Sequence, residues 1–375
     1  MLIRAVFWAS LGALGWTHVG YPAAAALLRR VRARPVRQGT DTPSVSVVVA
    51  AHNEEDVIRR RLENLLELDY PPELLEILVA SDASTDGTHA IVEEVAAGQP
   101  RVGLVEAPRG GKVAAQDRAV ARAAGDILAF SDANARWPRD ALRKLVRGFA
   151  DPDVAFVCGR LVLEQADGTN REGAYWRYET WLREQESALG SVTGGNGSIY
   201  AVRRRDYVEV DPRFGHDLSL PYLMVQRGRR AVYDPEALAF EKPSRDLEDE
   251  YRRKVRMFEH CWLILLEGRM FRDVPALYGL EVFSHRALRY GSGLLHLALL
   301  GSSIALAPRG GVYRLALGGQ LAGLGLAAAG RLRLPVPGAS LAYYYLLVTS
   351  ATVTALYRYT RYGVPAVWEK AEGTR

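Results

Sequence analysis

Between residues 44 and 240, apolar and polar positions follow two alternating patterns. Short apolar runs of strand length are followed by longer segments in which apolar residues recur every three or four positions, as on one face of a helix. This alternation predicts a parallel, doubly wound α/β sheet whose strands are joined by right-handed helical crossovers. The expected strands are residues 45–51, 75–81, 102–106, 127–130 and 154–161, and the expected helices are residues 54–68, 85–97, 112–123, 175–189 and 218–226.

Long apolar stretches lie at both ends of the chain. Residues 2–28 are apolar apart from Arg4 and His18, and three later stretches contain no Asp, Glu, Lys or Arg: residues 290–307, 315–330 and 334–357. A helix of about 20 apolar residues spans the roughly 30 Å of a bilayer core. We therefore expect one amino-terminal membrane helix and about three carboxy-terminal ones. Buried helices of a large soluble core are the alternative, but short links and frequent Gly and Ala favour packing in a bilayer.

The net charge of +5 is modest, but five arginines follow the first apolar stretch directly: Arg29, Arg30, Arg32, Arg34 and Arg37. The positive-inside rule places this cluster, and the domain after it, in the cytoplasm. A secretory signal peptide is the alternative, but the charges of a signal peptide precede its apolar core. Three later crossings would leave the tail outside, whereas the basic residues of that tail favour the inside. One segment that lies in the interface or re-enters would reconcile the two.

These features divide the chain into six expected parts. They are an amino-terminal transmembrane helix (1–28), a basic cytoplasmic linker (29–42), an α/β domain (43–244), interfacial amphipathic helices (245–285), carboxy-terminal transmembrane helices (286–357) and a tail (358–375). No basic block with interleaved aromatic residues indicates a nucleic-acid groove, so we expect no nucleic-acid partner. Cys158 and Cys261 stand far apart in apolar segments, which favours reduced buried thiols over a disulfide or a metal site.

Polar residues follow each of the first four expected strands, and the ends of parallel strands meet at one edge of a sheet. Asp82 is suited to accept hydrogen bonds from a base or a ribose, and Lys112, after two glycines, adds a cation for a diphosphate. Asp132, with Asn134 two positions later, is suited to hold a hard divalent cation. Each motif alone is ordinary turn or cap chemistry, but four at one edge favour a nucleotide site. No G-x-G-x-x-G follows the first strand, which argues against a dehydrogenase-type domain.

Four segments in order, PSVSVVVAAHNEED, VASDASTDGT, PRGGK and FSDAN, resemble the inverting family 2 glycosyltransferases with the GT-A fold. That family includes the membrane synthases of cellulose, hyaluronan and poly-N-acetylglucosamine, and the resemblance covers about residues 43–261. It implies a nucleotide-sugar donor, usually a UDP-sugar, held with Mg²⁺ or Mn²⁺. The donor-binding residues implied by the match are Ala51, Asn53, Glu54, Asp82, Lys112, Ser131 and Asp132. Asp132 and Asn134 are the implied metal residues, and Asn134 stands where many members have a second aspartate.

The same resemblance assigns the acceptor side. Gly194, Gly195 and Asn196 match a glycine-rich stretch under the acceptor, and Trp181 is a candidate for stacking on a sugar ring, unless it belongs to an amphipathic core or membrane-surface helix. Asp217 matches the catalytic base, while His216 replaces the usual acidic neighbour. A helix cap is the alternative role for Asp217.

Arg256 is the one residue of Arg253–Met257 that matches the Q-x-x-R-W motif of processive relatives. The match implies that Arg256 neutralises the leaving diphosphate. The missing glutamine and tryptophan weaken the case for a processive polymerase. A solvated basic helix on anionic lipid is the alternative for the surrounding charges.

The sequence therefore predicts a multi-pass enzyme of the bacterial inner membrane with a cytoplasmic catalytic domain. It is expected to transfer sugar from a UDP-sugar or similar donor to a lipid-linked or growing polysaccharide acceptor. One alternative is a processive synthase that also secretes its polymer, which would need a homodimer or a secretion partner. The other is a catalytically silent subunit that binds nucleotide sugar.

Overall fold

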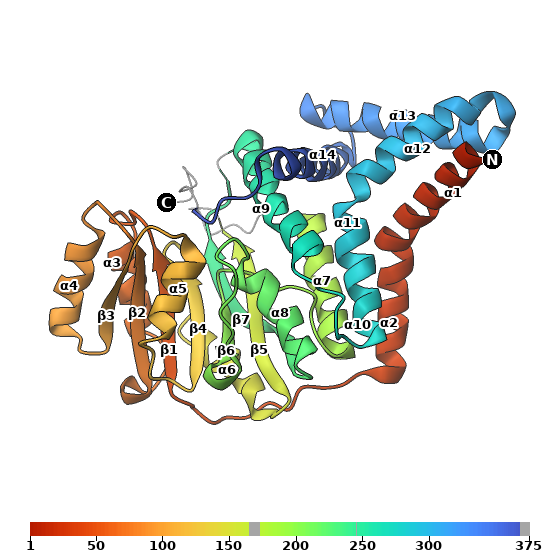
Figure 1. The fold of residues 1–375 in the computed structure, drawn as a ribbon. Coiled ribbons are helices and arrows are strands. Elements are labelled where there is room, and N and C mark those ends of the chain that lie inside the picture. The colour runs from red at the N-terminus through yellow and green to blue at the C-terminus, as the bar shows by residue number, and fades with distance from the viewer. Residues whose placement is uncertain (165–172, 245, 368–375) are drawn as a thin grey trace.

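A computed structural model describes residues 1–164, 173–244 and 246–367. One seven-stranded sheet forms the centre of the α/β part, in the order β3-β2-β1-β4-β6-β5-β7 (Figure 1). The strands are β1 (Val45–Ala51), β2 (Leu75–Asp82), β3 (Val102–Ala107), β4 (Ile127–Asp132), β5 (Val154–Leu163), β6 (Tyr200–Arg203) and β7 (Arg230–Glu241).

The first four strands form the parallel half of the sheet, as the sequence predicts. Strand β1 is buried along its whole length because both of its faces are covered. Val47 and Val49 belong to one core, with residues of α3 (Ile58–Leu66), whereas Val48 belongs to the opposite core, with residues of α5 (Lys112–Val120). Apolar residues on both faces therefore explain the continuous hydrophobic run of this strand.

The second half of the sheet is mixed, and here the prediction of a parallel sheet was wrong. Strand β6 is antiparallel to both β4 and β5, and β7 is parallel to β5. Neither β6 nor β7 was predicted. Strand β6 follows a glycine-rich loop and has only four residues, which is too short for a clear periodicity. The remaining helices of the α/β part are α4 (Thr88–Gly98), α6 (Ala141–Arg147), α7 (Ala174–Leu189) and α8 (His216–Gln226).

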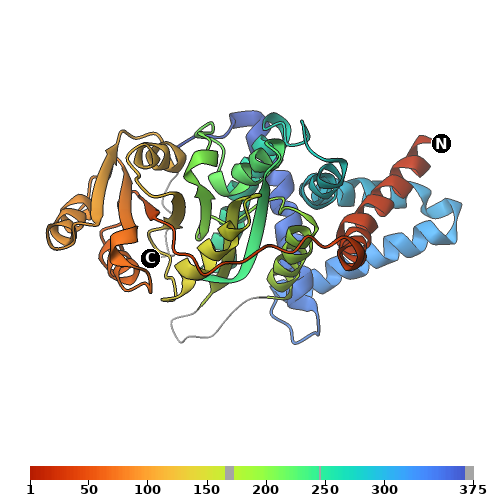
Figure 2. The same cartoon turned by 90° about the horizontal axis from the view of Figure 1, so that it is seen from below.

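The other helices form an arm at one side of the sheet (Figures 1 and 2). They are α1 (Leu2–Gly15), α2 (Tyr21–Arg32), α9 (Leu247–Glu267), α10 (Ala276–Glu281), α11 (Leu288–Tyr290), α12 (Ser292–Leu306), α13 (Gly311–Arg331) and α14 (Ala339–Tyr362), with π-helical residues 16–20 and 282–287 between α1 and α2 and between α10 and α11. Helix α2 packs on α7, α9 on α14, and α1 on α12.

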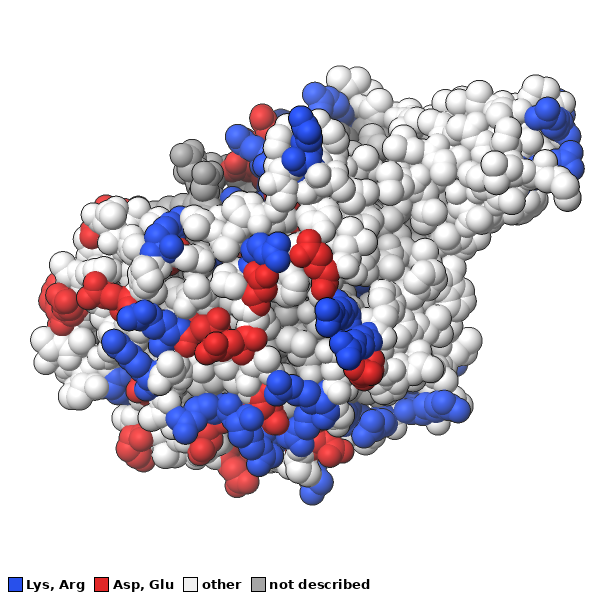
Figure 3. Space-filling view, viewed as in Figure 1, with Lys and Arg blue, Asp and Glu red and all other residues white. Residues whose placement is uncertain are grey.

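Among the described residues, helices long and apolar enough to span a membrane are fewer than the four expected. In the described part of the chain, α14 alone is long and apolar enough to cross a membrane, and residues 276–309 add a second span if their two halves, bent by 63°, count as one. In the amino-terminal segment, α1 and α2 are joined by the π-helical residues 16–20, and the residues at both junctions have helical backbone angles. Helix α13 contains Arg314 and Arg331. The arm nevertheless exposes large apolar side chains such as Trp8, Leu297 and Leu315, and most of its surface is uncharged in Figure 3.

A substitution at Gly159 tests how closely β5 and β7 pack. A Cβ at this position would stand 2.2 Å from the carbonyl oxygen of Ala237, beside the irregular register of the two strands. We expect Gly159→Ala to lower the free energy of unfolding by about 1–3 kcal/mol, the usual range for overpacking. The α/β part of Gly98→Ala should unfold like the wild type, because nothing lies within 4 Å of that Cβ. Equal urea midpoints for the two variants would contradict the packing described.

Candidate functional site

The polar residues predicted at the strand ends lie at one edge of the sheet. Ala51 of β1 pairs in register with Ser81 of β2, and Ala50 pairs with Asp132 of β4. Asp82 ends β2 beside Ala107 of β3. The parallel pairing therefore brings the candidate donor residues of three strands to one place. No single sequence motif indicates this meeting; only the motifs taken together do.

Asp82 holds the loop between β3 and α5. Its carboxylate is 1% exposed and accepts hydrogen bonds from the backbone N–H groups of Gly110 (2.7 Å) and Gly111 (3.1 Å). It also forms an ion pair with Arg109, a residue that the sequence analysis did not single out. The carboxylate thus fixes the conformation of the loop that precedes Lys112. The role of Asp82 in contacting a nucleoside stays a prediction.

Gly111 brings the carboxy-terminal segment against this loop. Its φ angle is +95°, and a Cβ there would stand 2.0 Å from the carbonyl oxygen of Ala366. The chain after α14 therefore lies against the donor edge of the sheet, as the dark blue segment of Figure 1 indicates. Gly111 and Ala366 are more than 250 residues apart in the sequence. A glycine is needed both for the backbone angle and for the close approach.

Three predicted site residues converge on Gly197. Lys112, the first residue of α5, forms an ion pair with Asp132 at the end of β4. A Cβ on Gly197 would stand 3.3 Å from Lys112 Nζ, 3.6 Å from Asp132 Oδ2 and 3.9 Å from Asp217 Oδ2. The missing side chain leaves room where the three charged groups meet. The candidate base, metal residue and diphosphate cation thus lie in one site.

The charges of this cluster act on one another. Burial raises the pKa of Asp217, Lys112 opposes that effect and Asp132 adds to it. Burial lowers the pKa of Lys112, but the carboxylates of Asp132, Asp217 and Glu241 outweigh it and leave the pKa raised. The carboxyl of Glu241, on β7, accepts a hydrogen bond from Ser198, and burial followed by Asp132 raises its pKa. Glu241 was missed because its strand was not predicted.

The residues around Asp132 fit a divalent cation that is completed by its substrate. No group of three or more His, Cys, Asp or Glu side chains among the described residues is arranged to hold a metal. Mg²⁺ commonly binds through one or two carboxylates together with substrate phosphates, so a fuller protein cage is not required. The carboxylate of Asp132 already contacts one cation in this structure, the ammonium group of Lys112. Asn134 lines a cavity of about 230 Å³ with Arg61 and Asn64 of α3.

The other predicted donor residues support the edge from within. Asn53 (φ +54°) accepts a hydrogen bond from the backbone N–H of Thr85 at 2.7 Å, and Glu54 is buried, with its carbonyl starting the turn that leads into α3. Ser131 accepts a hydrogen bond from Arg61 at 2.7 Å. Arg256 is half-buried on α9. Arg253 lies on the same helix, and its charge acts to lower the pKa of Glu241.

The glycine-rich loop is bound to the start of α8. The backbone N–H of Gly195 donates to the carbonyl of Asp217 at 2.7 Å. The Asn196 side chain accepts from the N–H groups of Ser198 (3.1 Å) and Ile199 (3.2 Å), which fixes the turn. The predicted acceptor residues of the loop and the predicted base therefore lie side by side.

His216 and Trp181 contact residues that have not been described above. His216 is buried, and its Nε2 lies 3.1 Å from the Tyr207 hydroxyl and 3.3 Å from Asp117. Trp181 is 38% exposed on α7 and stacks with Tyr178, which donates a hydrogen bond to the carbonyl of His18.

Comparisons with known proteins identify relatives of this chain. Residues 46–210 match the family described as Glycosyl transferase family 2. A β-monoglucosyldiacylglycerol synthase of Synechocystis is 33% identical over 174 residues, which cover 44% of this chain and 36% of that protein. An N-acetylglucosaminyltransferase of Rhizobium meliloti is 28% identical over 290 residues, which cover 72% of this chain and 66% of that protein. The chain thus spans well under half the length of the first of these relatives.

A solved structure extends the likeness of the fold to nearly the whole chain. The mannosyltransferase PcManGT of Pyrobaculum calidifontis, in complex with GDP-Man and Mn²⁺, superposes with a TM-score of 0.73 at 23% identity. The superposition covers 96% of this chain and 98% of that one. The helical arm is therefore part of the shared fold, together with the sheet.

Gly111→Ala should release the carboxy-terminal segment from the loop. The strained angle and the contact with Ala366 cost about 1–3 kcal/mol, which shifts the balance between docked and released segment by roughly 5–150-fold. We expect proteinase K to cleave within residues 363–367, the described part of the chain after α14, faster by that order. Gly98→Ala is the control, because nothing lies within 4 Å of that Cβ. Unchanged cleavage of the Gly111 variant would show that the segment is not held there.

Proposed function

We propose, from the glycosyl transferase family 2 domain that residues 46–210 form, that this chain is an inverting glycosyltransferase that uses a nucleotide-sugar donor. The observation that carries the proposal is the meeting of Lys112, Asp132 and Asp217 around Gly197. A cation for a leaving diphosphate, a carboxylate for a metal and a carboxylate for a proton are the groups that such a transfer needs.

Asp217 acts as the general base in this proposal. Its Oδ2, the oxygen nearest Gly197, takes the proton of the acceptor hydroxyl while that oxygen attacks the anomeric carbon from the side opposite the diphosphate. Burial raises the pKa of Asp217, which strengthens it as a proton acceptor, and Lys112 keeps it from rising further. The backbone bond from Gly195 to Asp217 holds the base beside the loop expected under the acceptor.

The leaving diphosphate is stabilised by groups on the other side of Gly197. Lys112 supplies a positive charge at the start of α5, where backbone N–H groups also point outward. The loop that Asp82 and Arg109 fix allows the backbone at Gly110 and Gly111 to approach the phosphates closely. Asp132, with Asn134 two positions later, would hold Mg²⁺ or Mn²⁺, which would supply further positive charge for the phosphate oxygens. The solved PcManGT contains Mn²⁺ and GDP-Man, which supports a metal and a nucleotide sugar.

The acceptor proposed is a lipid or lipid-linked glycan of the cell envelope, and the donor is a UDP-sugar. The relative from Synechocystis, named as a synthase of a glucosyl lipid, supports a lipid acceptor. Exposed apolar residues such as Trp8, Leu297 and Leu315 support contact of the arm with the bacterial inner membrane. The arginine cluster after the first helix supports a cytoplasmic catalytic domain. The intact set of Lys112, Asp132 and Asp217 argues against a silent subunit.

A panel of labelled nucleotide sugars tests the function and the metal together. Purified full-length protein in lipid vesicles is incubated with each donor and Mg²⁺ or Mn²⁺, and labelled products are separated by extraction and size. We expect one donor class to be consumed, and we expect EDTA to stop the transfer because the diphosphate then lacks its metal charge. Asp132→Asn should also remove most activity with the fold intact. Full transfer in EDTA would exclude the metal, and no consumption of any donor would exclude the function.

Asp217→Asn tests the base. We expect turnover to fall by about 10²–10⁴-fold, the usual contribution of general-base catalysis, with donor affinity changed by only a few fold. Wild-type transfer should rise with pH as Asp217 loses its proton, and because burial raises its pKa, the rise should lie above the ordinary aspartate value of about 3.9. The variant should lack this rise. His216→Ala, which keeps the carboxylate, is the control and should be far milder; the opposite ranking would assign the base to His216.

A further inference from the structure

Arg61 of α3 is a buried cation whose guanidinium bonds to neutral groups. It is 2% exposed. In the described part of the chain, its Nη2 donates to Ser131 Oγ at 2.7 Å, its Nη1 donates to Asn64 Oδ1 at 2.6 Å, and its Nε has no hydrogen-bond partner. The guanidinium also lies 4.8 Å from the centre of the Trp137 ring. A buried charge without an ion pair costs free energy of folding, so the position of Arg61 is explained by what it holds in place.

The bond to Ser131 joins Arg61 to the glycine-rich loop. Ser131 precedes Asp132 at the end of β4. Its hydroxyl oxygen accepts from Arg61, and its one hydrogen is shared between the carbonyls of Ser198 at 3.2 Å and Asp132 at 3.3 Å. Ser198 follows Gly197 directly. The guanidinium thus orients a hydroxyl that links the strand end to the loop.

A second route from Arg61 to Ser198 passes through Trp137. Asn64 Oδ1 accepts from Arg61 and from the backbone N–H of Trp137, the latter at 2.9 Å, and Asn64 Nδ2 donates to the Trp137 carbonyl at 2.8 Å. The indole N–H of Trp137 donates to the same Ser198 carbonyl at 3.0 Å. One guanidinium is therefore connected to one carbonyl by two routes.

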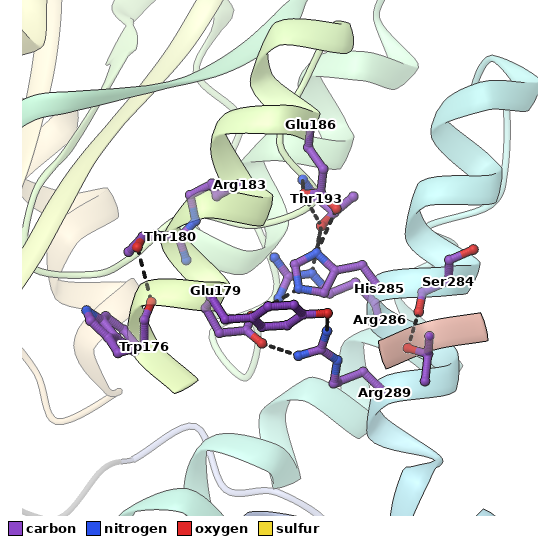
Figure 4. A network of polar contacts seen from close by, with 12 residues as sticks. Trp176, Glu179, Thr180, Arg183, Glu186, Thr193, Ser284, His285, Arg286 and Arg289 are labelled. Carbon is purple, nitrogen blue, oxygen red and sulfur yellow. Dashed lines mark hydrogen bonds and ion pairs between the residues drawn. The ribbon is translucent and has the colours of Figure 1, made fainter. Parts of the chain in front are cut away.

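The start of the same loop is held by a different network. In Figure 4, α7 and the π-helical turn between α10 and α11 meet near Thr193, which comes directly before Gly194. The Thr193 hydroxyl accepts from Arg286 Nε at 2.9 Å and donates to Glu186 at 3.0 Å. This network fixes the first residue of the loop, whereas the two routes from Arg61 reach its last residues.

The position of Ser198 decides how the two sides of the site face each other. Gly197, directly before it, stands where Lys112, Asp132 and Asp217 meet. A shift of Ser198 relative to β4 therefore changes the separation between the candidate metal residue and the proposed base. Such shifts matter because a misplacement of about 1 Å, even from a mutation far from the chemistry, costs roughly 10²-fold in rate.

The charge of Arg61 lies close to the same site. Arg61 lines the cavity of about 230 Å³ together with Asn134 and Glu241. Burial lowers the pKa of Arg61 to about 9, and Asp132 and Glu241 act to raise it. The side chain is therefore a cation at neutral pH. Arg61→Lys keeps this charge, whereas Arg61→Gln removes it.

We propose that Arg61 is a positioning residue for sugar transfer, which holds Ser198, and with it Gly197, at a fixed distance from Asp132. This inference rests on the proposed function, because it concerns the same three charged groups. Arg61 acts through its two hydrogen-bonded routes and touches neither donor nor acceptor. Its loss should impair the alignment of the acceptor with the donor, while the groups that bind the donor remain.

Transfer and hydrolysis of one donor separate positioning from general damage. Full-length protein in vesicles of total bacterial membrane lipid receives the labelled nucleotide sugar that the wild type consumes, and labelled lipid and free labelled sugar are separated by extraction. We expect Arg61→Gln to lower transfer by about 10²-fold and hydrolysis far less, because water needs no positioned acceptor. Its affinity for UDP with Mn²⁺ should stay within a few fold of wild type. Arg61→Lys should recover part of the transfer, because an ammonium still donates to one of the two partners.

Hydrogen exchange measured by mass spectrometry gives a readout that needs no substrate. We expect peptides that cover residues 194–199 to exchange faster in Arg61→Gln than in the wild type, because Ser198 has lost its support. Peptides from α5 should exchange at the wild-type rate, since they make no contact with either route.

Arg203→Gln is the matched control. Arg203 donates to the carbonyl of Val154 at 2.7 Å and pairs in register with Ile127, at the start of β4, so it lies at the opposite edge of the sheet. Its loss removes a half-buried guanidinium with several backbone contacts. It should lower stability without changing the ratio of transfer to hydrolysis.

A second variant reaches the same contact if Arg61→Gln does not fold. Ser131→Ala combined with Trp137→Phe removes both bonds to the Ser198 carbonyl and leaves Arg61 in place. It should lower the ratio of transfer to hydrolysis by the same order. Adding Arg61→Gln to it should cost little more, because residues that act through shared contacts are not additive.

The inference is overturned if Arg61→Gln, or the double variant in its place, keeps the wild-type ratio of transfer to hydrolysis or the wild-type exchange of residues 194–199. It is also overturned if Arg203→Gln lowers the ratio as much. Failure of the proposed function gives a different result: the wild type then consumes no nucleotide sugar, and the inference falls with it.

Discussion

The ion pair between Lys112 and Asp132 is the contact on which the rest of the site depends. It joins the start of α5 to the end of β4, and it places a fixed positive charge among three carboxylates that would otherwise repel one another. Asp217 stays next to this pair because Gly197 has no side chain and because Gly195 bonds to the backbone of Asp217. The positive charge available to a leaving group, on Lys112, and the carboxylate available to accept a proton, on Asp217, therefore both lie next to Gly197.

Close approaches of backbone at glycines connect this site to distant parts of the chain. Gly159 lets β7 lie against β5, and the carbonyl of Gly159 accepts a hydrogen bond from Asn196 in the acceptor loop. Gly111 lets the segment after α14 lie on the donor loop. A substitution at either position would act through packing on residues that it does not contact, because interiors at this density transmit strain.

The two sides of the site are held by different contacts. On the donor side, Asp82 is satisfied by Arg109 and two backbone N–H groups, and Asp132 is satisfied by Lys112, so this half is organised before any ligand binds. On the acceptor side, the backbone N–H of Gly195 bonds to the carbonyl of Asp217, and Arg286 donates to the hydroxyl of Thr193. Preorganisation of the donor side reduces the free energy needed to bind a donor.

Local patterns in the sequence determined the four parallel strands, the helices between them and the meeting of polar residues at their ends, because periodicity and strand order depend on neighbours along the chain. The tertiary structure alone decided what depends on distant partners. It paired β6 antiparallel and brought Glu241 and Arg109 into the site. It also placed a π-helical turn within the amino-terminal apolar segment, because the local hydrogen-bond pattern of a helix depends on packing as well as on hydropathy.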